Sequence, residues 1–310
     1  MPADTADHPT VTTVTTVTSD QRPTSDLPDR ARVVIIGGGV GGTSIAYHLA
    51  ELGETDVVLL DRDELTSGST FHSAGLVGQL RADPTLTRMN MYSVDLYRRL
   101  QQTEHAPAWV ESGGIKLAST PERLQEIRRQ ISWAQAYGLP LHEISADDAR
   151  DMFPLMSANG VVGACYLESD GHVDPSQLCM AMAALARQAG VTVRTHTRVT
   201  GIDTTDIGHG QRRVSRVRTV RGDIECEVVV DAGGIFAAEI ARMLDVRVPV
   251  IPMSHQYVVT ESFLNQHSPA TARPGDRTTP LPSLRDPDLL VYYRQEVEGL
   301  VMGGYERNPA

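Results

Sequence analysis

A glycine turn between two apolar stretches near the start of the chain restricts the possible folds more than any other feature. Val33–Ile36 form a continuous apolar run, which is typical of a strand buried on both faces. Gly37, Gly39 and Gly42 follow it with the spacing G-x-G-x-x-G. A helical stretch comes next, and a second apolar run ends at Asp61. This order of elements predicts a βαβ unit that binds a dinucleotide.

The residue types in this unit meet distinct physical demands. The first glycine makes a tight turn, the second lets the backbone approach a pyrophosphate, and the third lets the helix pack closely on the strand. We expect Ile45, Leu49 and Leu52 to form the apolar face of the helix, because they recur at helical spacing. Asp61 lies 19 residues after Gly42, where it can bind a ribose and repel a 2′-phosphate. NADP is therefore disfavoured, while FAD and NAD stay open because both bind through the same AMP half.

A second glycine turn lies in "VVVDAGGIFAAEIARML". An apolar run ends there at Asp231, and Gly233 and Gly234 precede another helical stretch. This arrangement is expected if a later strand of the same sheet returns to the cofactor. The alternative is an ordinary glycine turn without a ligand.

The remaining elements follow from periodicity and turn signals. Helices are expected over residues 86–102, 121–138 and 172–190, a hairpin around Gly113 and Gly114, strands within 191–202, 212–220 and 223–234, further strands from Val250 onward, and a loop over 268–287. The first of these helices should bury Leu86, Met89, Leu96 and Leu100. The second should bury Leu124, Ile127, Ile131 and Ala134. Pro175 near a first turn and Gly190 as a stop delimit the third.

Composition narrows the class of partner. The 310 residues carry a net charge of −11, which argues against nucleic acid and anionic membranes as partners, and no apolar run approaches a membrane span. Three widely spaced cysteines fit a reducing compartment better than a disulfide framework, so we expect a cytoplasmic protein. No metal site is expected, because no H-E-x-x-H or C-x-x-C spacing occurs. Lys116, the only lysine, lies outside any P-loop pattern.

The chain is long enough for roughly two domains. We expect a disordered leader over residues 1–30, with the fold beginning near Ala31. The predicted domains are an FAD-binding domain over 31–110 and 158–250 and a substrate domain over 111–157 and 251–310. The chain stops directly after the strand-like "GLVMGGYE", so we also expect it to be a fragment.

Several segments together resemble the FAD-dependent amine oxidoreductases of the D-amino-acid oxidase superfamily, and within it the dimethylglycine and sarcosine dehydrogenases. They are "VVIIGGGVGGTSIAYHLAELG", "LLDRDELTSGSTFHSAGLVGQLR", "DGHVDPSQL", "VVVDAGGIFAAEIARM", "MSHQYVVTE" and "VYYRQEVEGLVMGGYE". The resemblance implies FAD as the cofactor. It also implies an α/β fold, α+β over the whole chain, with a Rossmann-like FAD-binding domain, a mixed-sheet substrate domain, and the last part of the FAD domain missing.

The loop "TSGSTFHSAG" matches the family's G-S-T-W-H-A-A-G loop, whose histidine is joined covalently to the 8α carbon of the flavin. The resemblance implies the same link at His72, although Phe71 replaces the usual tryptophan and Ser73 a common alanine. By pattern alone, a lone loop histidine such as His72 is more often a structural residue, and only the resemblance favours flavin attachment. The predicted cofactor contacts are Gly37, Gly39, Gly42, Asp61, Arg62, Ser69, Thr70, His72, Val199 and Gly233.

His255 in "SHQY" and a tyrosine of "YYR" match active-site residues of the family, and we favour Tyr292 over Tyr293. The resemblance implies hydride transfer from an N-methylated glycine derivative to flavin N5, with the pair positioning the amine and managing its proton. Without the resemblance, the alternatives are that His255 is a histidine of the core and that Tyr292 is an ordinary tyrosine of a strand. Arg294 and Arg81 are candidates for binding a substrate carboxylate.

Three alternatives stay open. The chain can act on another amino acid with non-covalent FAD, or be a non-catalytic regulatory homologue, or be an inactive fragment. The electron acceptor is either an electron carrier protein or oxygen, and the position of Lys116 favours a dehydrogenase. Folate is expected only if a C-terminal region exists beyond this chain.

Overall fold

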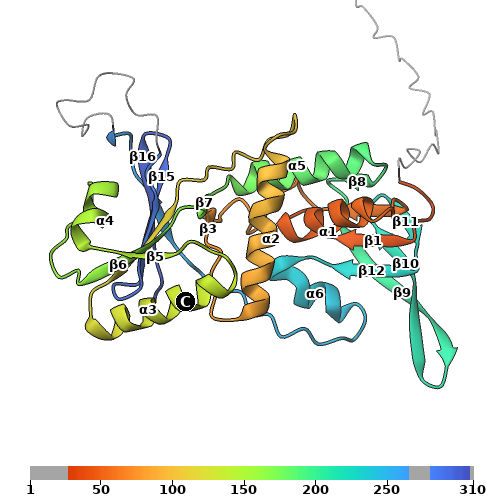
Figure 1. Ribbon diagram of the computed structural model, residues 1–310. Helices are drawn as coiled ribbons and strands as arrows, with labels where there is room; N and C mark the ends of the chain where they lie inside the picture. Colours follow the sequence, from red (N-terminus) through yellow and green to blue (C-terminus); the bar gives the residue numbers. More distant parts are fainter. Residues whose placement is uncertain (1–26, 265–279, 308–310) are drawn as a thin grey trace, which may run out of the picture.

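The chain forms two lobes side by side, each built around its own sheet (Figure 1). The computed structural model describes residues 27–264 and 280–307. Helices within these ranges are α1 (Val40–Glu51), α2 (Pro84–Leu100), α3 (Pro121–Ala136), α4 (Ala146–Met152), α5 (Pro175–Gln188) and α6 (Ala237–Arg242), with a 3₁₀ turn, η1 (Gly234–Phe236).

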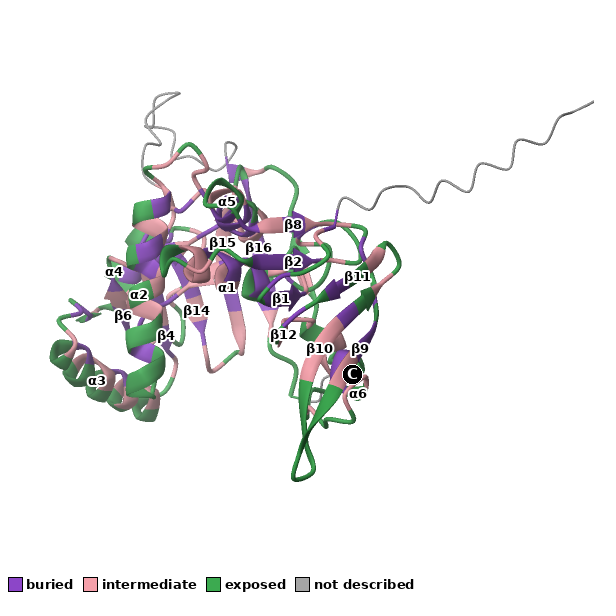
Figure 2. Cartoon of the chain, turned by 90° about the vertical axis from the view of Figure 1, so that its right-hand side faces the viewer, coloured by how far each residue is buried: buried purple, intermediate pink, exposed green. Residues whose placement is uncertain are grey.

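The parallel-sheet lobe contains four strands that all run parallel to their neighbours. In sheet order they are β12 (Val228–Asp231), β1 (Val33–Ile36), β2 (Val57–Leu60) and β8 (Thr192–Arg194). β1 and β2 are buried at every position, and Figure 2 shows both in the colour of buried residues. The predicted βαβ unit is therefore confirmed. The later strand, β12, does return to the same sheet and pairs with β1.

Two layers cover this parallel sheet. On one face α1 and α5 pack through Ala46, Ala183 and Ala186 against Ile35 and Leu59. The other layer is an antiparallel sheet of β9 (Val199–Gly208), β10 (Gln211–Thr219) and β11 (Gly222–Glu225). Burial on both faces explains why the strands read as unbroken apolar runs.

The helix ends follow their sequence signals. The Asp174 side chain accepts a hydrogen bond from Gln177 N at 2.8 Å, Pro175 is the first residue of α5, and Gly190 follows the helix with φ of +109°. Thr120 caps α3 in the same way by accepting from Arg123 N. The sequence therefore contained both boundaries of α5.

The predicted apolar faces of α1 and α2 were partly wrong. Leu52 is 84% exposed at the end of α1, because the helix ends at Glu51 and the chain turns away. Leu86 and Met89 of α2 are exposed, whereas Leu96 and Leu100 are buried. The buried apolar contacts of α2 with the parallel-sheet lobe come from its C-terminal half, against residues such as Trp109 and Leu178. In α3, by contrast, Ile127 and Ala134 are buried, and Leu124 and Ile131 pack against the same core.

The second lobe contains a seven-stranded mixed sheet. In sheet order its strands are β13 (Tyr257–Val259), β16 (Gly299–Gly304), β15 (Val291–Glu296), β14 (Ser283–Asp286), β4 (Gly114–Ala118), β6 (Gly163–Leu167) and β5 (His142–Ile144). Residues 163–167 thus lie in this sheet, although the predicted boundaries assign them to the FAD-binding domain. A two-stranded ribbon of β3 (Leu76–Val77) and β7 (Gly171–His172) is also present.

Three predictions about this lobe were wrong. No hairpin forms at Gly113 and Gly114, because β4 pairs with the distant strands β6 and β14 while Val110 bridges to His172. Residues 283–286 of the predicted loop form β14, and residues 265–279 lie outside the described ranges. After Val250, the chain becomes a strand only at Tyr257.

Residues before Ala31 take part in the fold. Leu27 is buried in the core beneath the antiparallel layer, and Asp29 O accepts a hydrogen bond from Glu225 N at 2.9 Å. The described contacts therefore begin earlier than the predicted boundary near Ala31. Residues 1–26 of the predicted leader lie outside the described ranges.

Candidate active site

The glycine turn after β1 is packed so closely that side chains are excluded. Gly37 has φ of +118°, and a Cβ there would lie closer than 3.0 Å to Ala232 O in the turn after β12. A Cβ on Gly42 would overlap Gly37 O at well under 3.0 Å. Gly233 N donates to Asp231 Oδ1 at 3.0 Å, which stabilises the second glycine turn, and its Ala232 O faces Gly37 of the first. The two turns therefore form one surface at the carboxyl ends of β1 and β12.

The N-terminus of α1 faces this surface. Its N-cap, Gly39, has no side chain to accept a hydrogen bond from the first turn. Val40 N instead donates to Thr70 Oγ1 at 2.9 Å, and a Cβ on Gly39 would lie 2.9 Å from the same hydroxyl. Thr70 comes from the loop that contains His72. The helix start thus offers backbone N–H groups to an anion, with Thr70 at its edge.

Asp61 lies at the end of β2 with acceptor capacity to spare. Its Oδ2 accepts from Gly38 N at 2.6 Å, and its Oδ1 accepts from Asp63 N at 2.8 Å. A carboxylate has about four lone-pair sites, so ribose hydroxyls can still donate to it. Thr197 N donates to the backbone carbonyl of Asp61 at 2.7 Å, which places the segment leading into Val199 next to the end of β2.

Arg62 connects the end of β2 to the turn after β12. Its guanidinium carbon lies 3.8 Å from the centroid of the Phe236 ring in η1. This contact closes the edge of the surface formed by the β1 and β12 turns. Together, the glycine turns, the open helix start and Asp61 fit the AMP half and pyrophosphate of a dinucleotide.

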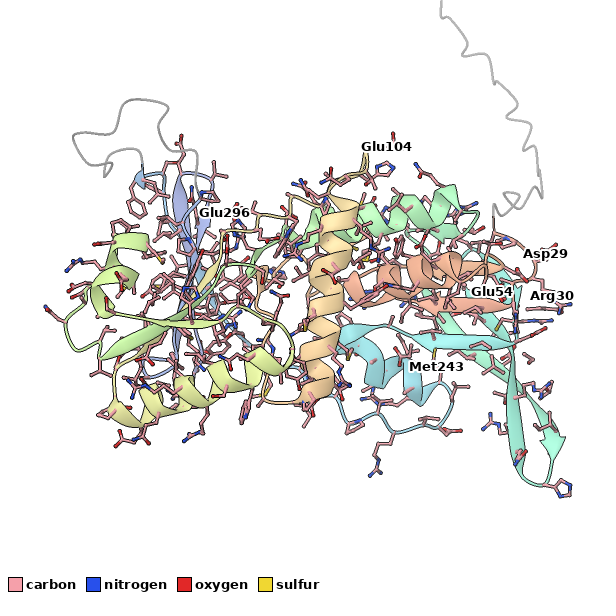
Figure 3. The ribbon with its side chains drawn as sticks, viewed as in Figure 1. Asp29, Arg30, Glu54, Glu104, Met243 and Glu296 are labelled. Atoms are coloured by element: carbon pink, nitrogen blue, oxygen red, sulfur yellow. The ribbon has the colours of Figure 1, made fainter. Side chains whose placement is uncertain are left out.

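The loop over residues 66–75 forms turns without a helix or strand. Ser69 and His72 are exposed, and the Phe71 and His72 rings lie with centroids 4.2 Å apart. Arg294 of β15 donates from Nε to Ala74 O and forms an ion pair from Nη2 to Glu296 at 2.5 Å. Glu296 is labelled in the second lobe in Figure 3. This arginine therefore ties the His72 loop to the seven-stranded sheet and is not free to clamp a substrate.

A row of residues crosses one face of the seven-stranded sheet. The register places Tyr257 opposite Gly303, Gly303 opposite Tyr292, Tyr292 opposite Arg285, and Arg285 opposite Lys116. Directly opposed residues point to the same face. Arg294 is two residues from Tyr292 in β15, so its side chain also points to this face. The face that carries Tyr292 and Arg285 is therefore the one that the His72 loop contacts.

Tyr292 and His255 are brought together through a third aromatic ring. The Tyr292 ring is buried and lies across Gly303, where a Cβ would overlap it. The Tyr305 ring lies 5.5 Å from Tyr292 and 5.7 Å from His255, centroid to centroid. His255 Nδ1 lies 3.2 Å from Glu306 Oε2, and His255 is exposed. Burial is the main cause that raises the pKa of Tyr292, so its phenol stays protonated at neutral pH.

Tyr293 points the opposite way. It packs in the core beneath the other face of the sheet, with Leu284 and with Ala149 and Phe153 from the region of α4. Its Cα partner in β14 is Leu284. Alternation along β15 therefore separates the two tyrosines of "YYR" onto different faces.

A cavity of about 380 Å³ lies on the Tyr292 face and is lined by Arg81, Asp170, Arg285, Lys116 and Tyr305, among others. Burial is the largest effect on Asp170 and raises its pKa to about 6, against hydrogen bonds from Gln79 and the charges of the two arginines. Burial also lowers the pKa of Arg81, and the charge of Arg285 lowers it further.

Sequence reasoning missed Tyr305, Asp170 and Arg285. Tyr305 and Asp170 stand in segments that carry the family resemblance, "GGYE" and "DGHVDPSQL", but nothing local distinguishes them from structural residues. Arg285 becomes visible only when strand register places it opposite Tyr292.

The cysteines are buried neighbours of this site: Cys165 lines the cavity, and Cys179 Sγ donates to Gly38 O at 3.3 Å. Cys165, Cys179 and Cys226 are all buried and free. Burial raises the pKa of Cys165 and of Cys226 to about 11, so both are neutral thiols. Among the residues that the structure describes, no group of three or more His, Cys, Asp or Glu side chains is placed to hold a metal ion.

A dinucleotide-binding parallel sheet beside a mixed sheet with a polar cavity defines a class of nucleotide-dependent oxidoreductases. The comparison with protein families specifies the class: the model described as "FAD dependent oxidoreductase", DAO, matches residues 32–310. The chain belongs to this family of FAD-dependent oxidoreductases.

The chain is similar to several curated proteins. It is 36% identical over 291 residues to mitochondrial sarcosine dehydrogenase of Mus musculus, covering 93% of this chain and 30% of that protein. It is 38% identical over 279 residues to mitochondrial dimethylglycine dehydrogenase of Homo sapiens, covering 90% and 31%. It is also 34% identical over 290 residues to the mitochondrial pyruvate dehydrogenase phosphatase regulatory subunit of Mus musculus, covering 91% and 31%. The chain thus spans less than a third of the length of these relatives.

Solved structures agree on the fold. The L-proline dehydrogenase of P. horikoshii superimposes with a TM-score of 0.78 at 28% identity, covering 92% of this chain and 72% of that one. In the described ranges, the helices are too short or too polar to cross a bilayer. The predicted cytoplasmic location stays a prediction.

Proposed function

We propose that this chain forms the flavin-binding and substrate-binding part of an amine oxidoreductase that acts on an N-methylated glycine derivative of the sarcosine or dimethylglycine type. FAD would be held by the β1 and β12 glycine turns, the α1 N-terminus and Asp61, and linked covalently through His72. His255 and Tyr292 would act on the substrate amine. When bound, FAD supplies the hydride acceptor at flavin N5.

One observation carries this proposal: Arg294 ties the loop of His72 to the sheet face that bears Tyr292. The dinucleotide surface and the polar cavity belong to different lobes, and a reaction between a cofactor and a substrate needs them to meet. The hydrogen bond to Ala74 O fixes the loop between them. The similarity to sarcosine and dimethylglycine dehydrogenases supports the choice of an N-methylated amino acid.

His255 and Tyr292 can act on the substrate amine in different ways. His255 is exposed beside Glu306, so it can exchange a proton with water and take one from the substrate ammonium. Tyr292 is buried and protonated, so it can donate a hydrogen bond that orients the neutral amine. The Tyr305 ring contacts both the Tyr292 and His255 rings and so connects the two side chains.

Lys116 does not fit the role of an oxygen-activating lysine. Its Nζ donates to Gln130 Oε1 at 3.0 Å and lies 3.5 Å from Glu126 Oε1. These partners support an electron carrier over oxygen as the acceptor.

The test is to express the chain, add FAD, precipitate it with acid and measure flavin fluorescence that stays with the protein on a denaturing gel. Wild type should retain the flavin and His72→Ala should lose it, with unchanged unfolding in urea as the control for the fold. A colourless wild-type pellet from folded protein would falsify covalent attachment. It would favour the alternative with non-covalent FAD.

Anaerobic mixing with sarcosine or dimethylglycine then tests the substrate. Bleaching of the flavin absorbance in wild type, and its loss in Tyr292→Phe, are the expected results. Flavin that binds tightly but is bleached by neither amine would contradict the proposed substrates and favour a regulatory homologue.

A further inference from the structure

A primary amine and a thiol share one wall of the cavity on the seven-stranded sheet. Lys116 of β4 and Cys165 of β6 both line the cavity, and they are directly opposite each other in the strand register. Directly opposed residues of antiparallel strands point to the same face, with their Cβ atoms about 4.5–5.5 Å apart. The flexible four-carbon stem of a lysine can bend across such a distance, so the amine of Lys116 can reach the sulfur of Cys165.

Helix α3 packs against this wall (Figure 1). Cys165 is 3% exposed and lies in the same core as Ile127 and Ala134 of α3. Lys116 Nζ donates to Gln130 Oε1 at 3.0 Å and lies 3.5 Å from Glu126 Oε1. The thiol is therefore screened from the outer surface, and a carboxylate stands beside the amine to accept its proton.

The amine and the thiol are both singular groups. Lys116 is the only lysine among the 310 residues, and of the three cysteines, all of which the structure describes, Cys165 alone lines this cavity. Burial raises the pKa of Cys165 to about 11, so its thiol is neutral and reacts poorly with reagents from solution. Cys165 therefore needs an electrophile that forms beside it, where the effective concentration is high.

We propose that Lys116 and Cys165 capture formaldehyde as a methylene bridge between Nζ and Sγ. Lys116 first gives its ammonium proton to Glu126, and the neutral amine adds to the carbonyl carbon. The adduct takes up one proton and loses water, which leaves an iminium on Nζ. The sulfur of Cys165 then bonds to the iminium carbon, and its S–H proton is released. In sum, one formaldehyde is added and one water is lost, without an oxidant or a reductant.

The proposed reaction would release formaldehyde in the same cavity. Loss of hydride from the methyl carbon of an N-methylated amine leaves an iminium, and water splits it into formaldehyde and the demethylated amine. Lys116 is opposite Arg285, which is opposite Tyr292, so the backbones of Lys116 and Tyr292 are separated by two strand spacings of about 4.8 Å. The source of the formaldehyde rests on the proposed function, whereas its capture by the pair does not.

The first experiment adds formaldehyde to the folded chain without FAD and measures the intact mass after rapid removal of the excess. Wild type should gain the mass of one carbon atom, which is formaldehyde minus water, and a peptide map should join the segments that contain Lys116 and Cys165. Lys116→Met and Cys165→Ala should each lower the bridged fraction at least about tenfold, because each removes one of the two neighbouring groups. Cys226→Ala is the matched control and should behave as wild type, since Cys226 is also buried but lies in the core beneath the antiparallel layer.

The second experiment replaces the added formaldehyde by FAD, sarcosine and an artificial electron acceptor. The same gain in mass and the same joined peptides should appear during turnover. Bridging by added formaldehyde but not during incubation with sarcosine would support the capture site and reject the proposed substrate.

Folded wild type that forms no Lys116–Cys165 bridge with added formaldehyde would overturn the proposal. So would an unchanged bridged fraction in Cys165→Ala with an intact thermal unfolding transition. If Cys165→Ala fails to fold, Lys116→Met decides the outcome, because the Lys116 side chain is only partly buried and lies outside the apolar core.

Discussion

The glycine surface of the parallel-sheet lobe and the cavity of the seven-stranded sheet are built by opposite means. The first uses backbone groups, with Gly37 and Gly42 excluding side chains so that N–H donors are exposed. The second uses charged side chains from Arg81, Asp170 and Arg285 around a single open glycine position. Local backbone geometry thus specifies the first site, and strand register assembles the second.

The largest expected effect tests the backbone side of this comparison. Gly42→Ala should lower the free energy of unfolding by roughly 3 kcal/mol or more, because its Cβ would overlap backbone atoms that cannot move aside. Gly41→Ala is the control, since a Cβ there meets nothing within 4 Å and should be neutral or stabilising by about 0.5 kcal/mol. Urea unfolding followed by circular dichroism measures both. Equal urea midpoints for Gly42→Ala and Gly41→Ala would show that the backbone around Gly42 can move to accommodate a Cβ.

The second expected effect tests the charged cavity through the pH dependence of the free energy of unfolding. Burial raises the pKa of Asp170 to about 6 in the folded state, from an ordinary value of 3.8. The folded protein therefore binds this proton more tightly than the unfolded chain, and stability falls as pH rises from about 4 to about 6. Asp170→Asn should remove this cost and raise the free energy of unfolding by roughly 3 kcal/mol above pH 6, with no gain below pH 4.

The free energies of unfolding of wild type and Asp170→Asn must be compared at each pH, because His172 also makes the stability of the fold depend on pH. Burial, with a smaller contribution from Arg294, lowers the pKa of His172 to about 4, so acidification destabilises the fold through this group. That effect has the opposite sign and is present in wild type and in Asp170→Asn alike. A difference between them that does not change with pH would contradict the raised pKa.

The smallest effect concerns the connection between the two sites. Arg294→Met should slow covalent flavin attachment about tenfold, because the loop loses the hydrogen bond to Ala74 O and His72 is less well positioned. The amount of gel fluorescence after timed addition of FAD measures the rate. Arg294→Lys should recover part of it, and Arg213→Met should match wild type. Attachment at the wild-type rate in Arg294→Met would show that the hydrogen bond to Ala74 O does not position His72.

The difference between local backbone geometry and long-range strand pairing explains which elements of the fold could be predicted from the sequence. The βαβ unit, β12 and the ends of α5 were predictable, because glycine spacing, apolar runs and capping residues act over a few neighbouring residues. The hairpin at Gly113 and Gly114 was predicted wrongly, because β4 finds partners at β6 and β14, far along the chain. Long-range pairing of this kind leaves no local signal.

The residues of the candidate site also divide into those that local patterns predicted and those whose contacts only the structure shows. The glycines, Asp61 and Thr70 lie together on one surface, as their spacing and the family resemblance led us to expect. Arg294 was a candidate for the substrate carboxylate, yet its contacts go to Ala74 O and Glu296. An arginine that contacts a substrate and one that fixes a loop look alike in sequence, and only their partners distinguish them.

The position of Tyr292 and Arg294 on one strand has a consequence for how this chain can vary in length. Two residues along a strand span about 6.8 Å, so β15 fixes the spacing between the tyrosine and the arginine that contacts Ala74 O. Inserting or deleting one residue between them would turn Arg294 to the face on which Tyr293 is packed. Side chains along β15 can therefore be exchanged, but a change of length between these two residues would separate the loop of His72 from the face that bears Tyr292.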